Sequence, residues 1–259
     1  MQVCNLASGS RGNCTVVQSG TSAVIIDNGL SVQDVVLRAQ MISLDLTQVR
    51  GIVVTHEHTD HIKGVAALSE HLGVPVYMHP DSYAQCPIKL RPARVAACDV
   101  CAPFEIGDLS IESFRLPHDA AYNMGFSIAD GKRKAVIATD LGHVSDATRE
   151  KLRGADLVML ESNHDVEMLR RGRYPYPLKR RILGGNGHLS NADCARETSG
   201  IVQAGARAIL LAHLSQDNNT PEIAFEQTKR ALAQIHAVEG RDVTVEVAMQ
   251  SRPTRRIEL

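Results

Sequence analysis

The sequence predicts an α/β protein in which two packed β-sheets are flanked by helices. Short apolar runs rich in β-branched residues recur along the chain, which is typical of buried strands. Strands come first, and helices alternate with strands further along, an order that suits a layered architecture. Ionisable residues gather just beyond the ends of several predicted strands. Ligand crevices of layered α/β proteins tend to lie at such strand ends.

The first part of the chain is dominated by short strands separated by turns rich in Gly and Ser. We expect strands at 2–8, 14–19, 23–29, 49–56 and 74–80. We expect helices at 34–41 and 60–73, and Gly73 supplies a stop signal for the second of them. The strand in "VRGIVVTH" stops at Thr55, where a cluster of histidines begins.

The second part of the chain alternates strands and helices. We expect strands at 109–119, 125–130, 134–142, 156–165, 206–219 and 242–248. We expect helices at 146–155, 191–205 and 221–240, with Asn191 as an N-cap. The segment "RRGRYPYPLKRRILGGNG", residues 170–187, has no clear period, so we expect a loop that passes over the site.

Composition excludes several classes of protein. The chain has 259 residues, 44% of them hydrophobic, so disorder is not expected. Aromatic residues make up 3% and Trp is absent, which argues against aromatic stacking as the main binding device. The net charge is −1, so no global basic field attracts nucleic acid. A nucleic-acid-binding protein of this composition needs a local patch or a metal centre.

The terminal sequence and the cysteines point to the cytoplasm. The opening "MQVCNLASGSRGNC" lacks a charged region followed by an apolar region, and no apolar stretch is long enough to span a membrane. Cys98 and Cys101 form one CxxC pair with Cys86 nearby, but we find no fourth zinc ligand at suitable spacing. We therefore expect ordinary thiols in a soluble cytoplasmic protein without membrane contact.

The stretch "IVVTHEHTDHIKG" concentrates metal-ligand residue types at the end of a predicted strand. It holds His56, His58, Asp60 and His61 within six residues. Imidazole and carboxylate groups are natural ligands for zinc, manganese and iron. His56 and His58 alternate and can point the same way, whereas Asp60 and His61 begin the next helix and can point to a second position. One short segment could therefore serve two metal ions.

Further ligands are available where later strands end. His118 in "RLPHDA", Asp140 in "IATDLG" and His213 in "LLAHLSQDNN" all occupy such positions. An aspartate with two oxygens is a good candidate to bridge two cations. The alternative is that these residues are helix caps or surface groups. For each of the three alone that alternative is strong, but their shared placement at strand ends favours a metal centre.

The pattern from His56 to His61, with the three later ligands, resembles the metallo-β-lactamase fold superfamily. The stretches "LASGSRGNC", "GNGHLSNADCA" and "LAHLSQDNNTPE" are similar to the YycJ/WalJ group of that superfamily. The resemblance implies a four-layer αβ/βα sandwich, with one domain over residues 1–259 and a dinuclear centre in a wide cleft. It assigns one metal to His56, His58 and His118. It assigns the other to Asp60, His61 and His213, with Asp140 bridging the two.

The same resemblance implies the chemistry. The YycJ/WalJ group is associated with 5′-to-3′ exonuclease action on DNA, and Glu161 and His188 resemble the acid–histidine pair of ribonuclease Z-like phosphodiesterases. Two Zn²⁺, Mn²⁺ or Fe²⁺ ions would hold a hydroxide that attacks the phosphorus, and Asp60 could orient it. His188 would protonate the leaving oxygen, because its ordinary pKa of roughly 6.5 suits that task. Glu161 would keep His188 protonated and aimed. Equally, His188 could be a surface loop residue and Glu161 a solvated acid.

Two other functions and one surface remain open at this point. A small-molecule hydrolase acting on a thioester, lactone or cyclic phosphodiester would share the metal chemistry, since the fold does not fix the substrate. A non-catalytic metal-bound scaffold is the second alternative. The basic residues Lys179, Arg180 and Arg181, with those of 170–173, could hold DNA phosphates or form a solvated cationic loop. Homodimers are common for this fold, but nothing in the sequence specifies the oligomeric state.

Overall fold

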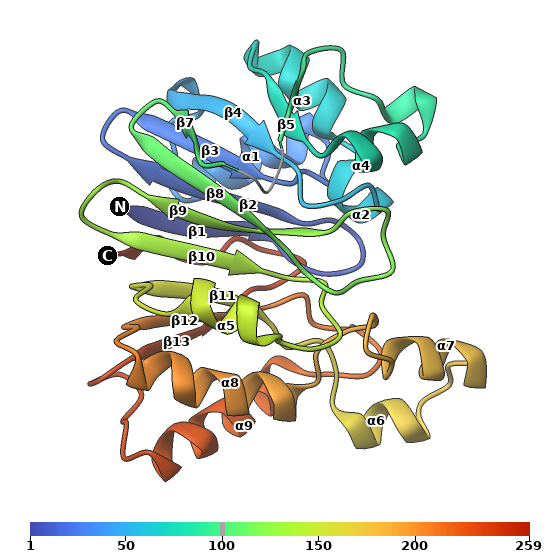
Figure 1. Cartoon of the computed structure of the whole chain (residues 1–259), viewed down its shortest axis with the longest axis vertical. Helices are drawn as coiled ribbons and strands as arrows, with labels where there is room; N and C mark the ends of the chain where they lie inside the picture. Colours follow the sequence, from blue (N-terminus) through green and yellow to red (C-terminus); the bar gives the residue numbers. More distant parts are fainter. Residues whose placement is uncertain (99–101) are drawn as a thin grey trace.

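The computed structural model describes residues 1–98 and 102–259. Two seven-stranded sheets lie face to face, and helices cover their outer faces (Figure 1). This arrangement confirms the predicted fold class. Both sheets are mixed: each has antiparallel strands over one part and parallel strands over the other.

The first sheet is built mainly from the N-terminal part of the chain. Its strand order is β14 (Ile257–Glu258), β1 (Gln2–Ala7), β2 (Cys14–Ser19), β3 (Ser22–Ile26), β4 (Val49–Val53), β5 (Val76–Met78) and β6 (Val95–Ala97). The strands from β3 to β6 run parallel to one another. Their carboxyl ends therefore share one edge of the sheet. The histidine cluster lies at this edge, directly after β4.

The second sheet repeats this arrangement with later strands. Its order is β13 (Thr244–Val247), β12 (Ala208–Ala212), β11 (Leu157–Glu161), β10 (Lys134–Ala138), β9 (Met124–Ala129), β8 (Leu109–Arg115) and β7 (Phe104–Ile106). The strands from β10 to β13 are parallel. Asp140, Glu161 and His213 lie at or just beyond the carboxyl ends of three neighbouring strands of this set.

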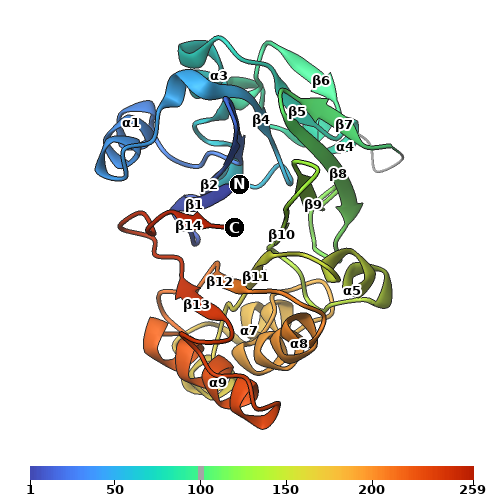
Figure 2. The same cartoon turned by 90° about the vertical axis from the view of Figure 1, so that its left-hand side faces the viewer.

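The helices form the two outer layers (Figure 2). The first sheet is accompanied by α1 (Val32–Met41), α2 (Thr59–Ile62), α3 (Val65–Leu72), α4 (Pro80–Gln85) and the 3₁₀ turns Leu46–Gln48 and Ile88–Leu90. The second is accompanied by α5 (Asp146–Leu152), α6 (Val166–Arg171), α7 (Tyr176–Ile182), α8 (Asn191–Gln203) and α9 (Pro221–Gln234). None of the helices in the described part of the chain is long and apolar enough to cross a membrane.

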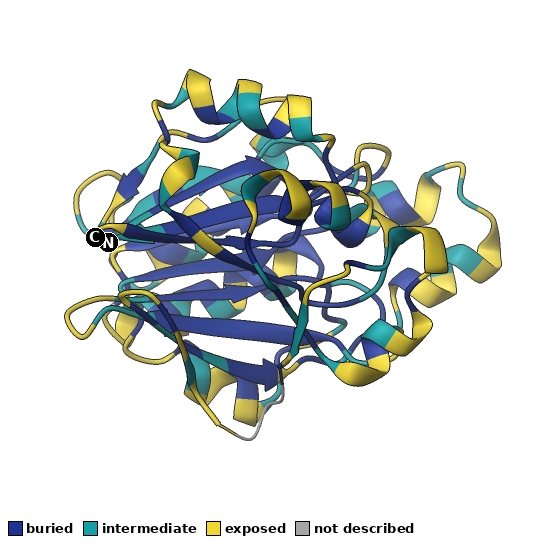
Figure 3. Ribbon diagram, turned by 90° about the horizontal axis from the view of Figure 1, so that it is seen from above, coloured by how far each residue is buried: buried dark blue, intermediate teal, exposed yellow. Residues whose placement is uncertain are grey.

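Three apolar clusters hold the four layers together. One lies between the sheets and includes Val53 of β4, Phe126 of β9 and Leu210 of β12. A second joins the first sheet to its helices, and a third joins the second sheet to α5, α8 and α9. In Figure 3 the strands are buried and the outer faces of the helices are exposed. Burial of these apolar faces is the main force that fixes the strand ends around the site.

The structure corrects the predicted helix at 60–73. The chain forms two helices there, α2 and α3, with Gly64 as the N-cap of the second. A Cβ atom at Gly64 would lie 1.8 Å from the Leu30 carbonyl oxygen, so the break is fixed by a close backbone contact. A sequence period does not reveal such a contact. The stop at Gly73 is confirmed, because this residue caps α3 in the left-handed conformation with φ of 70°.

Two other predictions were wrong. The segment 170–187 is not a continuous loop, because it contains α7 and the end of α6. The absence of a clear period suggested a loop, but the short helix α7 forms there, with Pro177 in its first turn, where proline is tolerated. Asn191 is not an N-cap: Ser190 caps α8 by accepting a hydrogen bond from the Asp193 amide at 3.1 Å. The Asn191 side chain instead pairs with Ser162 and Asn219.

The cysteines that the structure describes are buried. Burial raises the pKa of Cys4 and of Cys194 to about 12 in each case, so both remain thiols at neutral pH. Within the described ranges, no candidate metal cluster includes a cysteine. Cys101, and with it the CxxC pair, lies outside the described residues.

Candidate metal centre

The first half of the site follows β4 directly. His56 is fully buried in the loop after the strand, and His61 lies on α2 with 1% of its surface exposed. Asp27, just beyond the neighbouring β3, accepts hydrogen bonds from the Thr55 amide and hydroxyl, both at 2.8 Å. Parallel pairing of β3 with β4 thus places an acid beside the start of the histidine cluster.

The second half of the site comes from the other sheet. His118 lies three residues beyond β8, Asp140 two beyond β10, and His213 directly follows β12. Asp140 and His213 have φ angles of 60° and 56°, a backbone region that residues other than glycine seldom adopt. The Asn123 side chain donates to the carbonyl of Asp140 at 2.5 Å, and Asn163 donates to that of His213 at 2.8 Å.

The seven predicted ligands converge. Atoms that could bind a metal ion lie within 4.8 Å of one another in overlapping groups. One group is formed by His56, His58 and His118, and another by Asp60, His61 and His213. Asp140 belongs to a group with His56 and His61 and to a further group with His213, Glu161 and His188. The carboxylate of Asp140 therefore lies between the two sets of ligands.

Four of the five imidazoles are oriented through their Nδ1 atoms. The partners are the Thr55 hydroxyl for His56 (2.9 Å), Asp27 for His61 (2.8 Å), the Gly187 carbonyl for His118 (3.1 Å) and Glu161 for His213 (3.0 Å). Carboxylates and carbonyls only accept hydrogen bonds, and Thr55 already donates to Asp27, so each Nδ1 carries the proton. The Nε2 atoms are left to face the centre, as in metal-binding histidines.

Two imidazoles of the first group, those of His56 and His118, are shifted towards the neutral form. Burial, reinforced by the neighbouring histidines, holds the pKa of His56 well below its ordinary value. Burial also lowers the pKa of His118. The Nε2 atoms of both residues are buried and have no hydrogen-bond partner in the described part of the chain. A neutral imidazole with a free Nε2 lone pair is the form that binds a metal ion.

The carboxylates of the site create a negative electrostatic field. Burial opposes ionisation of Asp60, yet His61 and His213 together hold the pKa of this carboxyl below its ordinary value. Burial likewise opposes a proton on His61, but Asp140, Asp60 and Asp27 raise its pKa well above the ordinary value. Among the described ion pairs, no Lys or Arg reaches Asp27, Asp60, Asp140 or Glu161. The same negative field that favours protons here favours a divalent cation.

His188 and Glu161 form a pair next to these ligands. His188 Nδ1 lies 2.7 Å from Glu161 Oε1 and 3.7 Å from Asp140 Oδ1. Glu161 is fully buried, and its other oxygen accepts from the amides of Leu141 and Leu189 at 2.9 and 3.2 Å. Burial would lower the pKa of His188, but the Glu161 carboxylate raises it. His188 therefore retains a proton more readily than an isolated histidine does.

The sequence interpretation missed the residues that orient the ligands. Asp27 and Thr55 position His61 and His56, and Asn13 contacts both Asp60 and His61, at 3.2 and 3.1 Å. Asp27 follows the apolar run in "AVIIDNG", just as Asp140 follows the apolar run in "KAVIATDLG". The rule that selected Asp140 could therefore have selected Asp27 as well.

A cavity opens beside the ligands. Its volume is about 420 Å³, and its lining includes His118, Arg115, Tyr122, His143 and Asn186. The polar lining carries cationic and neutral groups and no carboxylate. The cavity therefore gives access to His118 beside the cationic Arg115.

The two-sheet fold and the His/Asp clusters define a metal-dependent hydrolase of the metallo-β-lactamase fold. The family model described as the beta-lactamase superfamily domain matches residues 23–214. The chain belongs to this family, and the predicted membership is thereby confirmed.

Relatives within the family are close. The chain is 37% identical over 230 residues to exodeoxyribonuclease YycJ of Bacillus anthracis, covering 88% of this chain and 87% of the relative. It is 33% identical over 245 residues to exodeoxyribonuclease WalJ of Streptococcus pneumoniae, covering 93% and 91%. The metallo-β-lactamase fold protein YhfI of Bacillus subtilis superposes with a TM-score of 0.70 at 16% identity, covering 98% and 99%. The chain therefore belongs with the YycJ/WalJ proteins, and the structural match shows the fold.

Proposed function

We propose that this chain is a phosphodiesterase that uses two divalent metal ions to shorten DNA from its 5′ end. The observation that carries the proposal is the convergence of two ligand sets on Asp140, with the His188–Glu161 pair beside them. The names of the relatives, exodeoxyribonucleases, support DNA as the substrate. The 5′-to-3′ polarity is what the resemblance to the YycJ/WalJ group implies. Residues 1–259 would act as one domain, because both sheets contribute ligands.

The chain's own residues fit the proposed ions. His56, His58 and His118 would hold one ion and Asp60, His61 and His213 the other, with Asp140 shared between them. Zn²⁺, Mn²⁺ and Fe²⁺ all accept such a set of imidazoles and carboxylates. When bound, such ions supply Lewis acidity, which activates water and neutralises charge on the phosphoryl oxygens.

The remaining residues would orient the reactants and move one proton. Asp60 would accept a hydrogen bond from the attacking water and align it. His188 would donate its Nδ1 proton to Glu161, and the raised pKa that this carboxylate causes would favour a second proton at Nε2. His188 would pass the Nε2 proton to the leaving oxygen. Without that proton the leaving group is an alkoxide, which departs slowly. Glu161 would act through His188 as a positioning residue.

The proposal is tested with metal-stripped protein, to which Mn²⁺ or Zn²⁺ is added in separate reactions. The substrate is a 5′-phosphorylated duplex labelled at its 3′ end, so that products show the direction of digestion. We expect progressive shortening from the 5′ end, no activity in Asp60→Ala, and a loss of roughly 10²–10⁴-fold in His188→Ala. His71→Ala, which changes an exposed histidine at the end of α3, should match the wild type.

Each other outcome contradicts a stated part of the proposal. Shortening from the 3′ end refutes the polarity. Unchanged rates in His188→Ala refute the proton donor. Intact DNA with either metal, in protein that retains about two ions, refutes the nuclease and favours a small phosphodiester or ester substrate.

A further inference from the structure

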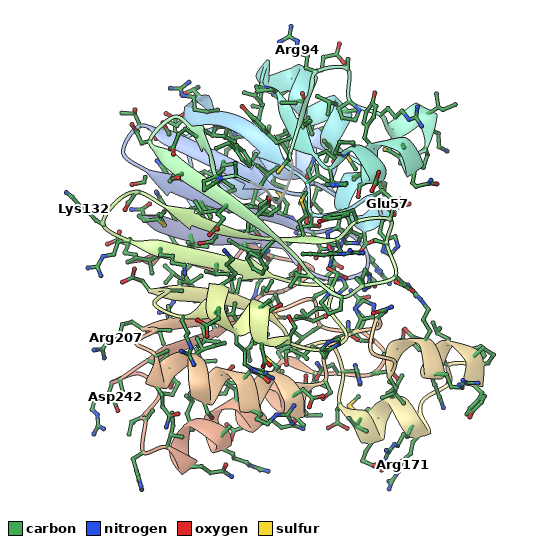
Figure 4. The ribbon with its side chains drawn as sticks, viewed as in Figure 1. Glu57, Arg94, Lys132, Arg171, Arg207 and Asp242 are labelled. Carbon is green, nitrogen blue, oxygen red and sulfur yellow. The ribbon has the colours of Figure 1, made fainter. Side chains whose placement is uncertain are left out.

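A short helical projection lies between the two members of the His188–Glu161 pair in the sequence. It comprises α6 and α7, residues 166–182, and we call it the basic arm. In Figure 1 both helices extend away from the sheets, on the side of the molecule where α2 also lies. Figure 4 shows Arg171 on α6, on the side of the helix away from the sheets.

Positive charge is concentrated on and around the arm. Residues 165–187 contain six cations and two acids, a net charge of +4. The whole chain has a net charge of −1, so the remaining residues together carry −5. A projection with this excess of positive charge is expected to meet a polyanion.

Four of the six cations lie within ion-pair distance of a carboxylate, but two of these four share a single acid. Arg170 and Arg171 share Glu167, at 3.2 and 3.5 Å. In the described part of the chain, Arg180 forms no ion pair, and its guanidinium lies 6.0 Å from the ring of Tyr176. Tyr176 is 72% exposed. The arm therefore offers exposed guanidinium groups together with an aromatic face, which is the combination that binds nucleic-acid backbones and bases.

The arm is anchored to the candidate metal centre. Arg181 of α7 donates two hydrogen bonds to the Asp119 carboxylate. Asp119 Oδ1 in turn lies 3.4 Å from His118 Nε2. At the end of the arm, the carbonyl of Ile182 accepts a hydrogen bond from the amide of His188 at 3.0 Å. A phosphate chain that lies along α7 therefore leads to the ligands and to the proposed proton donor.

We propose that the basic arm is a binding surface for the phosphate backbone of DNA, and that it holds the substrate beyond the bond being cleaved. The inference rests on the proposed function, because it takes DNA as the substrate. Contacts of this kind carry little sequence preference, which suits an enzyme that must move along any sequence. Each phosphate that the arm neutralises releases counterions, so binding weakens steeply as salt rises.

The test measures DNA binding without cleavage. Fluorescence anisotropy of a labelled duplex is recorded in EDTA between about 50 and 200 mM salt, for the wild type and for the double variant Arg171→Gln/Arg180→Gln. We expect the slope of log K against log salt to become shallower by about 2 and the affinity at low salt to fall at least tenfold. Circular dichroism and thermal melting establish that the variant is folded.

A matched variant controls for the loss of charge. Lys229→Gln/Arg230→Gln removes two adjacent exposed cations from α9, one of which also pairs within its own helix, with Glu226 at 3.9 Å. We expect this control to change the slope and the affinity much less than the arm variant.

Three outcomes would overturn the proposal. They are an arm variant that binds like the wild type, a control that loses as much affinity as the arm variant, and a wild type that does not bind DNA. Failure of the proposed function is distinct from these. A wild type that binds through the arm in EDTA but leaves DNA intact with either metal would refute the nuclease and retain the arm.

Discussion

The substitution Asp27→Asn tests how the imidazoles are aimed. Asp27 accepts the Nδ1 proton of His61 at 2.8 Å and the Thr55 hydroxyl at 2.8 Å, and Thr55 in turn accepts from His56 Nδ1. One buried carboxylate therefore orients an imidazole in each ligand group. The asparagine has nearly the same shape, but one of its two terminal atoms is an NH₂ donor.

The magnitude follows from the hydrogen bonds that asparagine cannot make. Its oxygen can still accept from the Thr55 amide, which bonds Oδ1 at 2.8 Å. The NH₂ group then faces the Nδ1 proton of His61, and two donors cannot pair. Turning the proton to Nε2 relieves this conflict but blocks the atom that faces the metal. Loss of such an orienting partner costs roughly 10–100-fold in metal affinity, or about 1.4–2.8 kcal/mol.

Metal affinity is measured by competition with a chromophoric chelator on metal-stripped protein. Asp130→Asn is the matched control: Asp130 also accepts several hydrogen bonds, from Ser19, Lys132 and Arg133, but at the β9–β10 turn and not at the metal centre. We expect its metal affinity to equal that of the wild type. A metal affinity of Asp27→Asn within twofold of the wild type, in folded protein, would refute the orienting role.

Three further predictions concern packing, metal removal and pH. Gly29→Ala should lower the metal affinity, because its Cβ would lie 1.9 Å from the Asp60 carbonyl oxygen and must displace that residue. Gly200→Ala on α8 is the control, since a Cβ there has nothing within 4 Å. It should leave the metal affinity unchanged and raise the free energy of unfolding in chemical denaturation by up to about 1 kcal/mol. Chelation should lower the Tm, since an ion at about 100 times its Kd contributes roughly 2.7 kcal/mol; an unchanged Tm in scanning calorimetry would contradict a bound ion. Burial lowers the pKa of His164 to about 4, so the folded protein binds fewer protons than the unfolded chain. The stability that this gives is complete above the unfolded pKa of about 6.5 and is lost as pH falls from there to about 4. In denaturant titrations over this pH window, the free energy of unfolding of His164→Gln should depend less on pH than that of the wild type.

Part of the cluster that the fold brings together could be selected from the sequence because its signal is local. His56, His58, Asp60 and His61 stand within six residues at the end of an apolar strand, a density of ligand types that favours a metal centre. His118 was harder, since it lies three residues beyond β8 and its Nδ1 partner is the distant carbonyl of Gly187. The sequence supplied the residue type, and only the fold supplied the partner.

Errors in the fold arose where a distant contact overrides a local pattern. Gly64 divides the expected helix because its backbone packs on Leu30, which is 34 positions away and invisible to a helical period. The arm was expected to be a loop because its sequence has no clear period, yet it forms two short helices, one with Pro177 in a first turn that tolerates it. In both places the amino-acid pattern was compatible with two structures, and packing selected one.

The distribution of the ligands explains why the site depends on the whole fold. Each ligand group takes residues from both sheets: His56 and His58 follow β4 and meet His118 beyond β8, whereas Asp60 and His61 meet His213 beyond β12. An ion held by either group therefore joins the two sheets across their shared edge. The orienting partners are divided in the same way, with Asp27 on one sheet and Glu161 on the other. In the proposed site neither sheet holds a complete ligand group by itself, so the metal affinity would depend on the packing between the sheets.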